Sequence, residues 1–245
     1  TAVCHPDTYL NKLLLGSSDG RMLILNVHTG DVVYVFQAES FLNPERVAVT
    51  CLANSPALDT VAVGLADGRC VIHNVLHDKT VMDFGHDGAK RPVRSCAFTS
   101  GSSHGEPLLA VAGDSGTISV WSLEKRRLRT VLVGAHDGAC LSLYFFPGRQ
   151  TLMSSGADNA VKQWIFDNAD GSGRLLRFRA GHGSPPTKVA FYGENGHRLL
   201  SAGGEDRALR VFSAIQDQQS RELSQQNVER RGCGQRDGRL REGGS

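Results

Sequence analysis

The sequence contains no apolar run that approaches the roughly 20 residues of a membrane-spanning helix, so no membrane span is predicted. It has little net charge, with 27 Lys and Arg against 25 Asp and Glu in 245 residues. This balance gives no whole-chain reason to expect nucleic-acid binding. A P-loop, a dinucleotide-binding fingerprint and an H-E-x-x-H pair are also missing. We therefore expect no enzyme activity, no cofactor, no metal site and no small-molecule substrate.

None of the six cysteines forms a C-x-x-C pair, and there is no secretory signal at the start of the chain. Cys51, Cys70, Cys96 and Cys140 lie in or beside apolar runs. Because a chain of this length can bury a sizeable core without disulfides, we interpret these cysteines as buried, reduced thiols. This interpretation favours the cytosol or the nucleus over export.

A repeated unit, rather than the composition, organises the chain. Five gap-free segments, spaced by 48, 48, 43 and 48 residues, each follow a short apolar run rich in small residues. Each pair of runs is typical of two strands joined by a tight turn of Asp, Asn, Gly or Ser. The five segments begin at Asp19, Asp67, Ser115, Asp158 and Asp206.

A further strand-like run precedes each segment. Another run follows each of the first four segments, but the run after the fifth is weak. Four strands every 43 to 48 residues are typical of β-propeller blades. The predicted fold is therefore all-β, with about five blades of four antiparallel strands. The expected blades cover residues 1–37, 47–85, 93–134, 140–180 and 186–214, with a weak fourth strand near 220–223. Residues 215–245 are polar, and we expect a disordered tail.

Two short marks give the chain a resemblance to the WD40 family: Gly-His before the first strand of a blade and Trp at the end of the third. The resemblance implies a structural hydrogen-bond network of His, Ser or Thr, Asp and Trp. The fourth blade has all four residues, whereas the third has Val111 and Ser115 in place of two of them, and the fifth has Phe212 in place of Trp. The expected network residues are His136, Ser154, Asp158 and Trp164 in the fourth blade, His86 and Trp121 in the third, and His182 and Asp206 in the fifth.

The same residue types could form a hydrolytic Ser-His-Asp triad. We favour the structural interpretation because the set recurs in part at the repeat period, whereas a catalytic set should occur once. In the fifth blade, Ser201 is displaced by one residue because of the extra glycine in Gly203-Gly204.

Three stretches are more specific than general blade sequences: HPDTYLNKLLLGS from His5, GADNAVKQWIFD from Gly156 and GRLLRFRAGH from Gly173. They resemble the WD-repeat subunits of the UTP-B subcomplex of the small-subunit processome, which associate with U3 small nucleolar RNA. The resemblance implies a nucleolar scaffold in 18S rRNA maturation, with other processome proteins as partners and U3 or pre-ribosomal RNA as a contact. It also implies two tandem seven-bladed propellers, of which this chain would be a part. The start at Thr1, without Met, fits that expectation.

Two basic clusters on expected loops are candidates for contact with RNA phosphate or an acidic partner, although solvated charged turns are the simpler interpretation. They comprise Lys90, Arg91 and Arg94, and Lys125, Arg126, Arg127 and Arg129. The alternative function is a general WD40 adaptor that binds peptides in ubiquitin ligation or signalling. If five blades belong to a larger ring, both end blades expose apolar faces, and we expect an open arc.

Overall fold

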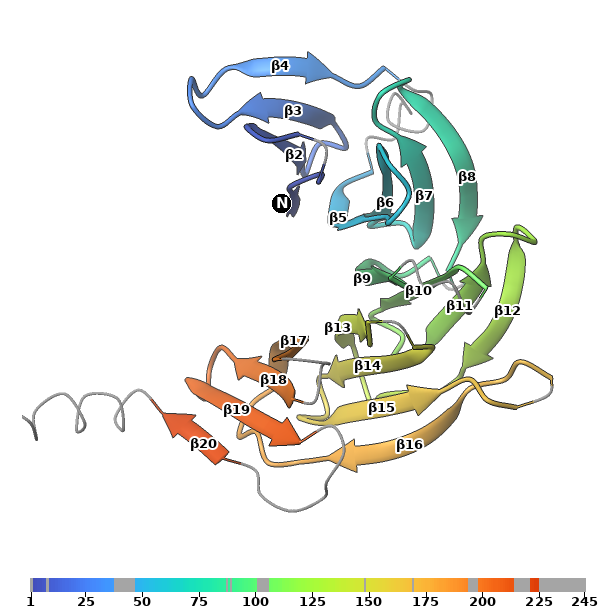
Figure 1. Cartoon of the computed structure of the whole chain (residues 1–245), viewed down its shortest axis with the longest axis vertical. Coiled ribbons are helices and arrows are strands. Elements are labelled where there is room, and N and C mark those ends of the chain that lie inside the picture. Colours follow the sequence, from blue (N-terminus) through green and yellow to red (C-terminus); the bar gives the residue numbers. More distant parts are fainter. Residues whose placement is uncertain are drawn as a thin grey trace, which may run out of the picture.

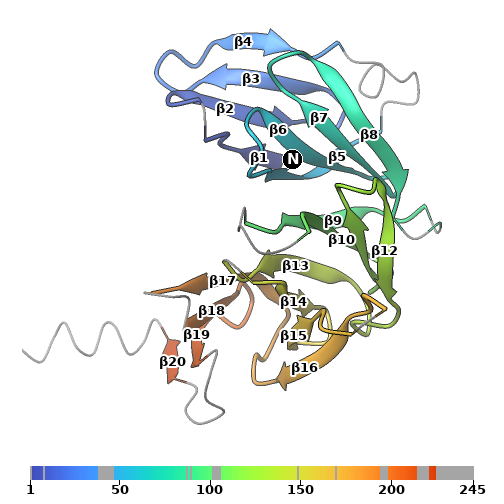
Figure 2. The ribbon, with the colours of Figure 1, turned by 45° about the vertical axis from the view of Figure 1, so that its right-hand side comes forward.

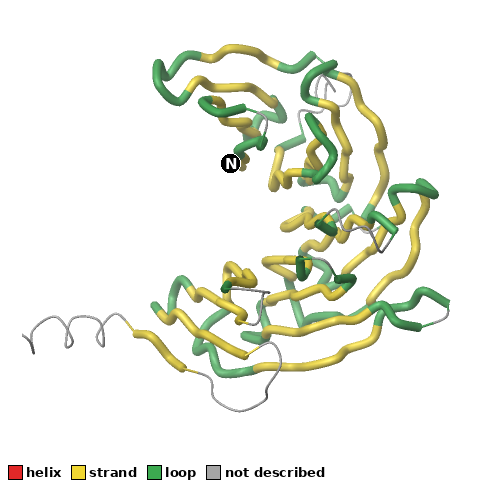
Figure 3. Tube along the Cα trace, viewed as in Figure 1, coloured by secondary structure: helices red, strands yellow, loops and turns green. Residues whose placement is uncertain are grey.

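The computed structural model describes residues 2–213 apart from 8, 38–46, 87, 89, 101–105, 148, 169 and 194–197, together with the backbone of 221–224. This part of the chain is built from five four-stranded antiparallel sheets and contains no helix (Figure 3). None of its segments is therefore a helix that could cross a membrane. The sheets confirm the predicted all-β class, and we call them blades one to five in chain order.

Each blade has its four strands in sequence order. Blade one contains β1 (Ala2–Cys4), β2 (Lys12–Gly16), β3 (Met22–Asn26) and β4 (Val32–Val35). Blade two contains β5 (Val49–Asn54), β6 (Thr60–Leu65), β7 (Arg69–Asn74) and β8 (Lys79–Gly85). Blade three contains β9 (Val93–Phe98), β10 (Leu108–Gly113), β11 (Ile118–Ser122) and β12 (Arg127–Leu132).

Blade four contains β13 (Cys140–Phe145), β14 (Thr151–Gly156), β15 (Val161–Ile165) and β16 (Arg174–Arg179). Blade five contains β17 (Pro186–Tyr192), β18 (Arg198–Gly203), β19 (Ala208–Ser213) and β20 (Arg221–Ser224). β20 lies where the sequence signal for a fourth strand is weak, inside the segment expected as a polar tail. Its pairing with β19 uses backbone groups, so it needs no apolar run. The rest of 215–245 lies outside the described residues.

The blades form an open arc, with blades one and five at its two ends (Figures 1 and 2). The first strands lie along the inner side of the arc, and the fourth strands follow its outer rim. Neighbouring first strands pack in the order β1, β5, β9, β13 and β17. This arrangement is a partial β-propeller, as the repeat predicted.

The second-to-third strand turn has the same chemistry in all five blades. Its first side chain accepts a hydrogen bond from the N–H two residues on, and its second residue has positive φ. The second residues are Gly20, Gly68, Gly116, Asn159 and Arg207. Glycine and asparagine adopt this left-handed backbone at low cost, whereas Arg207 adopts it with a side-chain penalty.

A β-bulge marks one repeated position. The pairing of third and fourth strands shifts register just before Leu25, His73, Trp121 and Trp164 in blades one to four. This is the position at which the WD40 resemblance places tryptophan, and we call it the Trp position. The backbone therefore keeps the same local form whether or not the residue is tryptophan.

Four apolar clusters lie between successive blades. One joins blades one and two, with Leu14 and Met22 packed against Val61 and Val63, all almost fully buried. The other three clusters fill the remaining junctions in the same way. Sheet-on-sheet burial is thus the main source of cohesion.

The outward face of blade one carries a row of cross-strand neighbours, Val3, Leu15, Leu23 and Val35. Val3 is 61% exposed and Val35 is 38% exposed. No described sheet covers this row (Figure 1). The row is apolar like the rows at the four blade junctions, but no neighbouring blade among the described residues packs on it.

The glycine at the end of β6 generates a test of the blade-two to blade-three contact. A Cβ added at Gly64 would collide with the Cys51 sulfur and lie 2.7 Å from Val93 Cγ1, whereas nothing lies within 4 Å of one added at Gly85. We expect Gly64→Ala to destabilise the fold by about 1–3 kcal/mol through overpacking. The measurement is the thermal unfolding midpoint, with Gly85→Ala as the control expected to change little. Equal midpoints for the two variants would contradict close packing at this junction.

Candidate functional site

The fourth blade contains a continuous hydrogen-bonded chain of four side chains. Trp164 Nε1 donates to Ser154 Oγ at 2.8 Å. Ser154 Oγ lies 2.7 Å from His136 Nε2, and His136 Nδ1 lies 2.8 Å from Asp158 Oδ1. A carboxylate only accepts, so His136 carries its proton on Nδ1 and its Nε2 accepts from the serine hydroxyl. The chain ties the loop before β13 to the β14–β15 turn.

Burial and charge fix the protonation of this chain. Burial lowers the pKa of His136, and the hydrogen bond that His136 donates to Asp158 opposes this shift. Burial also works against ionisation of Asp158, but hydrogen bonds from His136 and Lys162 outweigh it and lower the carboxyl pKa. The stable state is therefore a neutral histidine beside a carboxylate, which also accepts from Lys162 Nζ at 3.0 Å.

The connectivity of Ser154, His136 and Asp158 is that of a hydrolytic triad, but the environment differs. The serine is fully buried, and its oxygen is already occupied by the Trp164 N–H. A nucleophile has to reach a substrate carbonyl. The arrangement thus favours a structural role.

Blade five assembles three members of the chain despite its extra residue. His182 lies 2.7 Å from Ser201 Oγ and 2.8 Å from Asp206 Oδ2. The register explains this, because Ser201 pairs with Arg210 as Ser154 pairs with Lys162. The additional glycine is absorbed in the turn, so the serine keeps its place. Phe212 brings no donor, and the chain ends at the serine.

Blade three differs from blade four at the indole end of the predicted network, and the part played by His86 stays a prediction. Val111 pairs with Ser119 as Ser154 pairs with Lys162, so the hydroxyl that joins tryptophan to histidine in blade four is replaced here by an apolar side chain. Among the described residues, Trp121 Nε1 is buried without a hydrogen-bond partner, and the ring packs on Phe84 with centroids 4.1 Å apart. Ser119 Oγ instead donates to the carbonyl of His86 at 2.6 Å.

Blade two carries a fully buried histidine at the Trp position. His73 Nε2 lies 3.3 Å from Asp78 Oδ1, and the Phe36 ring of blade one meets the imidazole edge-on. Asp78 also accepts from Tyr34 Oη at 2.8 Å and from the Gln37 N–H at 2.7 Å. This set joins blades one and two, and nothing in the repeat pattern indicates the role of Asp78.

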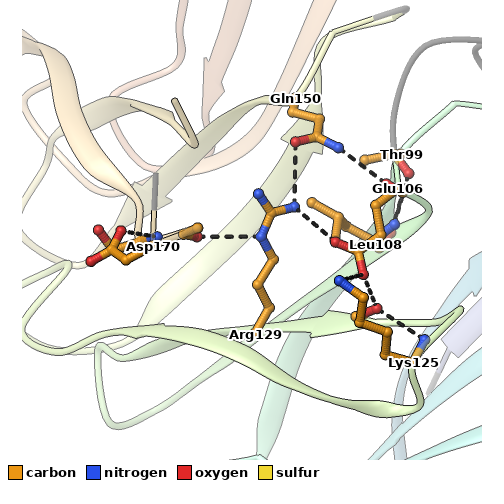
Figure 4. Close-up of polar contacts among 10 residues, drawn as sticks. Thr99, Glu106, Leu108, Lys125, Arg129, Gln150 and Asp170 are labelled. Carbon is orange, nitrogen blue, oxygen red and sulfur yellow. Dashed lines mark hydrogen bonds and ion pairs between the residues drawn. The ribbon is translucent and has the colours of Figure 1, made fainter. Parts of the chain in front are cut away.

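A second polar network lies on the side of the first-to-second and third-to-fourth strand connections (Figure 4). Glu106 accepts from Ser122 and forms ion pairs with Lys125 at 3.5 Å and Arg129 at 3.4 Å. Its pKa is lowered, chiefly by the Ser122 hydroxyl and against the effect of burial. Arg129 also donates to the Gly171 carbonyl and to Gln150 Oε1, both at 3.3 Å. Sequence reasoning missed Glu106, since it lies outside the repeat pattern.

These contacts separate the cations of the two predicted basic clusters into those that form ion pairs and those that do not. Arg129 is 17% exposed and held by the network of Glu106, and Arg94 forms a two-pronged pair with Asp114 at 2.6 and 2.9 Å. Lys125 is 55% exposed beside the same Glu106. In the two clusters, the exposed cations that form no ion pair with a described residue are Lys90, Arg91, Arg126 and Arg127. Among the described residues, no cluster of His, Cys, Asp and Glu could hold a metal ion.

Removal of the central serine tests the cooperativity of the blade-four chain. Ser154→Ala leaves the Trp164 N–H and His136 Nε2 buried without their partner, and we expect a loss of about 1–3 kcal/mol. Combined with Trp164→Phe in a double-mutant cycle, it should give a coupling energy of about 0.5–3 kcal/mol, measured by denaturant unfolding. Strictly additive losses would show that the two side chains act independently.

His73 generates a prediction about acid stability. Burial lowers its pKa from 6.5 to about 4, with Asp78 opposing the shift. Between pH 6.5 and about 4, the His73 imidazole is therefore protonated in the unfolded chain but not in the folded protein. The free energy of unfolding thus falls as the pH drops through this range. The loss is on the order of 3 kcal/mol at the acid end. His73→Phe should reduce this acid-dependent loss of the unfolding midpoint, whereas His77→Phe, at an exposed position, should retain it; identical pH profiles would sink the idea.

The chain is similar to a known protein family and to several of its members. A family model described as the WDR36/Utp21 first beta-propeller matches residues 1–167. The U3 small nucleolar RNA-associated protein 21 homolog of Schizosaccharomyces pombe is 44% identical and is matched over 93% of this chain and 24% of its own length. Human WD repeat-containing protein 36 is 39% identical, with coverage of 91% and 24%. The U3 small nucleolar RNA-associated protein 21 of Saccharomyces cerevisiae is 34% identical, with coverage of 90% and 23%.

The chain thus spans about a quarter of the length of these curated relatives. Among solved structures, a chain in the crystal structure of a mitotic checkpoint complex is similar with a TM-score of 0.66 and 20% identity. The match covers 84% of this chain and 58% of the other. At this identity the likeness shows the fold alone.

Proposed function

Because the chain belongs to the WDR36/Utp21 family of β-propeller proteins, we propose that it forms part of a non-catalytic scaffold in ribosome biogenesis. The observation that carries the proposal is the family match over 1–167, together with relatives named for association with U3 small nucleolar RNA. The scaffold would act in the small-subunit processome, in the nucleolus, and would be required for 18S rRNA maturation. Its partners would be other processome proteins, including those of UTP-B.

The described geometry supports a role in binding rather than catalysis. The Ser-His-Asp sets of blades four and five tie loops to turns, and Ser154 and Ser201 are both fully buried. Loops at both sides of the blades, by contrast, present exposed side chains to solvent. Loops on a rigid scaffold are where binding residues most often lie.

The open faces of the arc support a further element of this proposal. The apolar row on blade one would be covered by additional blades of the longer protein, as each described junction is covered by its neighbour. Residues 1–214 would then be one part of a larger propeller. Direct contact of the exposed cations with U3 or pre-ribosomal RNA stays a prediction.

Purification of the full-length protein from cells tests the proposal. We expect processome proteins and U3 RNA to be recovered together, and depletion of the protein to lower 18S rRNA relative to large-subunit rRNA. An unrelated WD-repeat protein purified in parallel controls for nonspecific recovery. Recovery of a ubiquitin-ligase core would instead favour the adaptor alternative, and unchanged 18S rRNA after depletion would refute the scaffold role.

A further inference from the structure

Three adjoining cavities form one groove that runs from the β1–β2 connection of blade one across blades two, three and four, on the side that carries the network of Glu106. Their volumes are about 500, 550 and 480 Å³. The first and second share Ser55, Pro56, Phe98 and Ser100, and the second and third share Glu106. We call the three together the loop groove; its inner end lies at Asp7 and its outer end at Arg127.

The middle of the loop groove is mainly apolar, although the charged Glu106, Glu124 and Arg149 also line it. Pro56, Ala57, Phe98, Pro107 and Leu123 line it. Two prolines and an alanine of this set are exposed, while the phenylalanine and leucine are half-buried. A concave apolar surface of this size can accommodate the apolar side chains of a bound peptide.

The two ends of the loop groove differ in charge. Asp7 lines the inner end, whereas Lys125, Arg127 and Arg129 line the outer end with Glu106 and Asp170. Glu106 is already engaged by two of these cations, so its charge is compensated. The exposed Arg127 faces the outer end without such compensation and favours an anionic group there.

Hydrogen bonds fix the side of the loop groove where its middle meets its outer end. Glu106 and Gln150 come from two different loops and Arg129 from strand β12; the three hold one another, and Arg129 also donates to the carbonyl of Gly171 (Figure 4). A preorganised wall lowers the entropy cost of binding. The network thus shapes a surface and does not merely join two blades.

We propose that the loop groove binds an extended segment of a partner polypeptide, with an apolar side chain in the middle and an acidic residue at Lys125 and Arg127. The length of the groove, its apolar middle and its basic outer end together define this partner. A nucleic acid fits less well, because carboxylates line all three parts of the loop groove and repel a phosphate backbone, which is charged at every nucleotide; they are Asp7, Glu106, Glu124 and Asp170. The proposal deepens the scaffold function by naming the chemistry of one partner, and it depends on that function only for the partner's origin.

The test uses the full-length protein and a random dodecapeptide library displayed on phage. We expect enrichment of peptides that combine an aliphatic residue with Asp or Glu a few positions away. A labelled copy of an enriched peptide should bind about tenfold more weakly to Arg127→Glu and to Ala57→Glu. It should also bind more weakly as salt is added, because the outer contacts are exposed.

Arg91→Glu is the matched control, since Arg91 is an exposed cation that does not line the groove. Its affinity should stay at the wild-type value, and unchanged unfolding midpoints of all variants would exclude misfolding. Two results would overturn the proposal. The first is that no enriched peptide binds more weakly to the Arg127→Glu variant. The second is that no peptide binds, while oligouridine RNA binds and is weakened by Arg127→Glu. Because purified peptides are used, failure here leaves the recovery of U3 RNA with the full-length protein as an independent result.

Discussion

Every blade has two apolar faces, and a four-stranded sheet can bury both only by packing between two other sheets. The rest of the structure depends on this constraint. It orders the blades along the arc and places Leu14 against Val61 at one junction and Leu152 beside Ile118 at another, whereas no described sheet lies over the row of Val3 and Leu23 at one end. Burial of such rows contributes roughly 25 cal/mol per Å² of apolar surface, so the junctions outweigh any single polar contact.

Hydrogen-bond networks vary from blade to blade while the junctions persist. Blade four has the full chain ending at Trp164, blade five stops at Ser201, and blade three keeps Trp121 with no partner for its N–H among the described residues. Blade two replaces the tryptophan with His73 and links it to Asp78. The β-bulge before this position is retained in the first four blades, which shows that the backbone form does not require the indole.

The sequence predicts the parts of the fold that repeat, and local chemistry explains why. Alternating strands, turns such as Asp67-Gly68, and the His136 to Trp164 spacing all depend on residues close in sequence or at a fixed period. The network of Glu106 could not be predicted, because its members come from separate strands and connections of blades three and four and follow no period. For the same reason, Arg129 resembles the exposed Arg127 in sequence but is held in place in the structure.

The strand order within each blade has a consequence for synthesis. Every sheet is completed by hairpins between consecutive strands, so no strand waits for a distant part of the chain. The face of each sheet that packs against the next blade, however, stays exposed to solvent until that next blade has been synthesised. The chain therefore forms as a one-dimensional stack, in which each completed blade offers an apolar face to the next one, while the row of Val3 and Leu15 stays exposed at the opposite end.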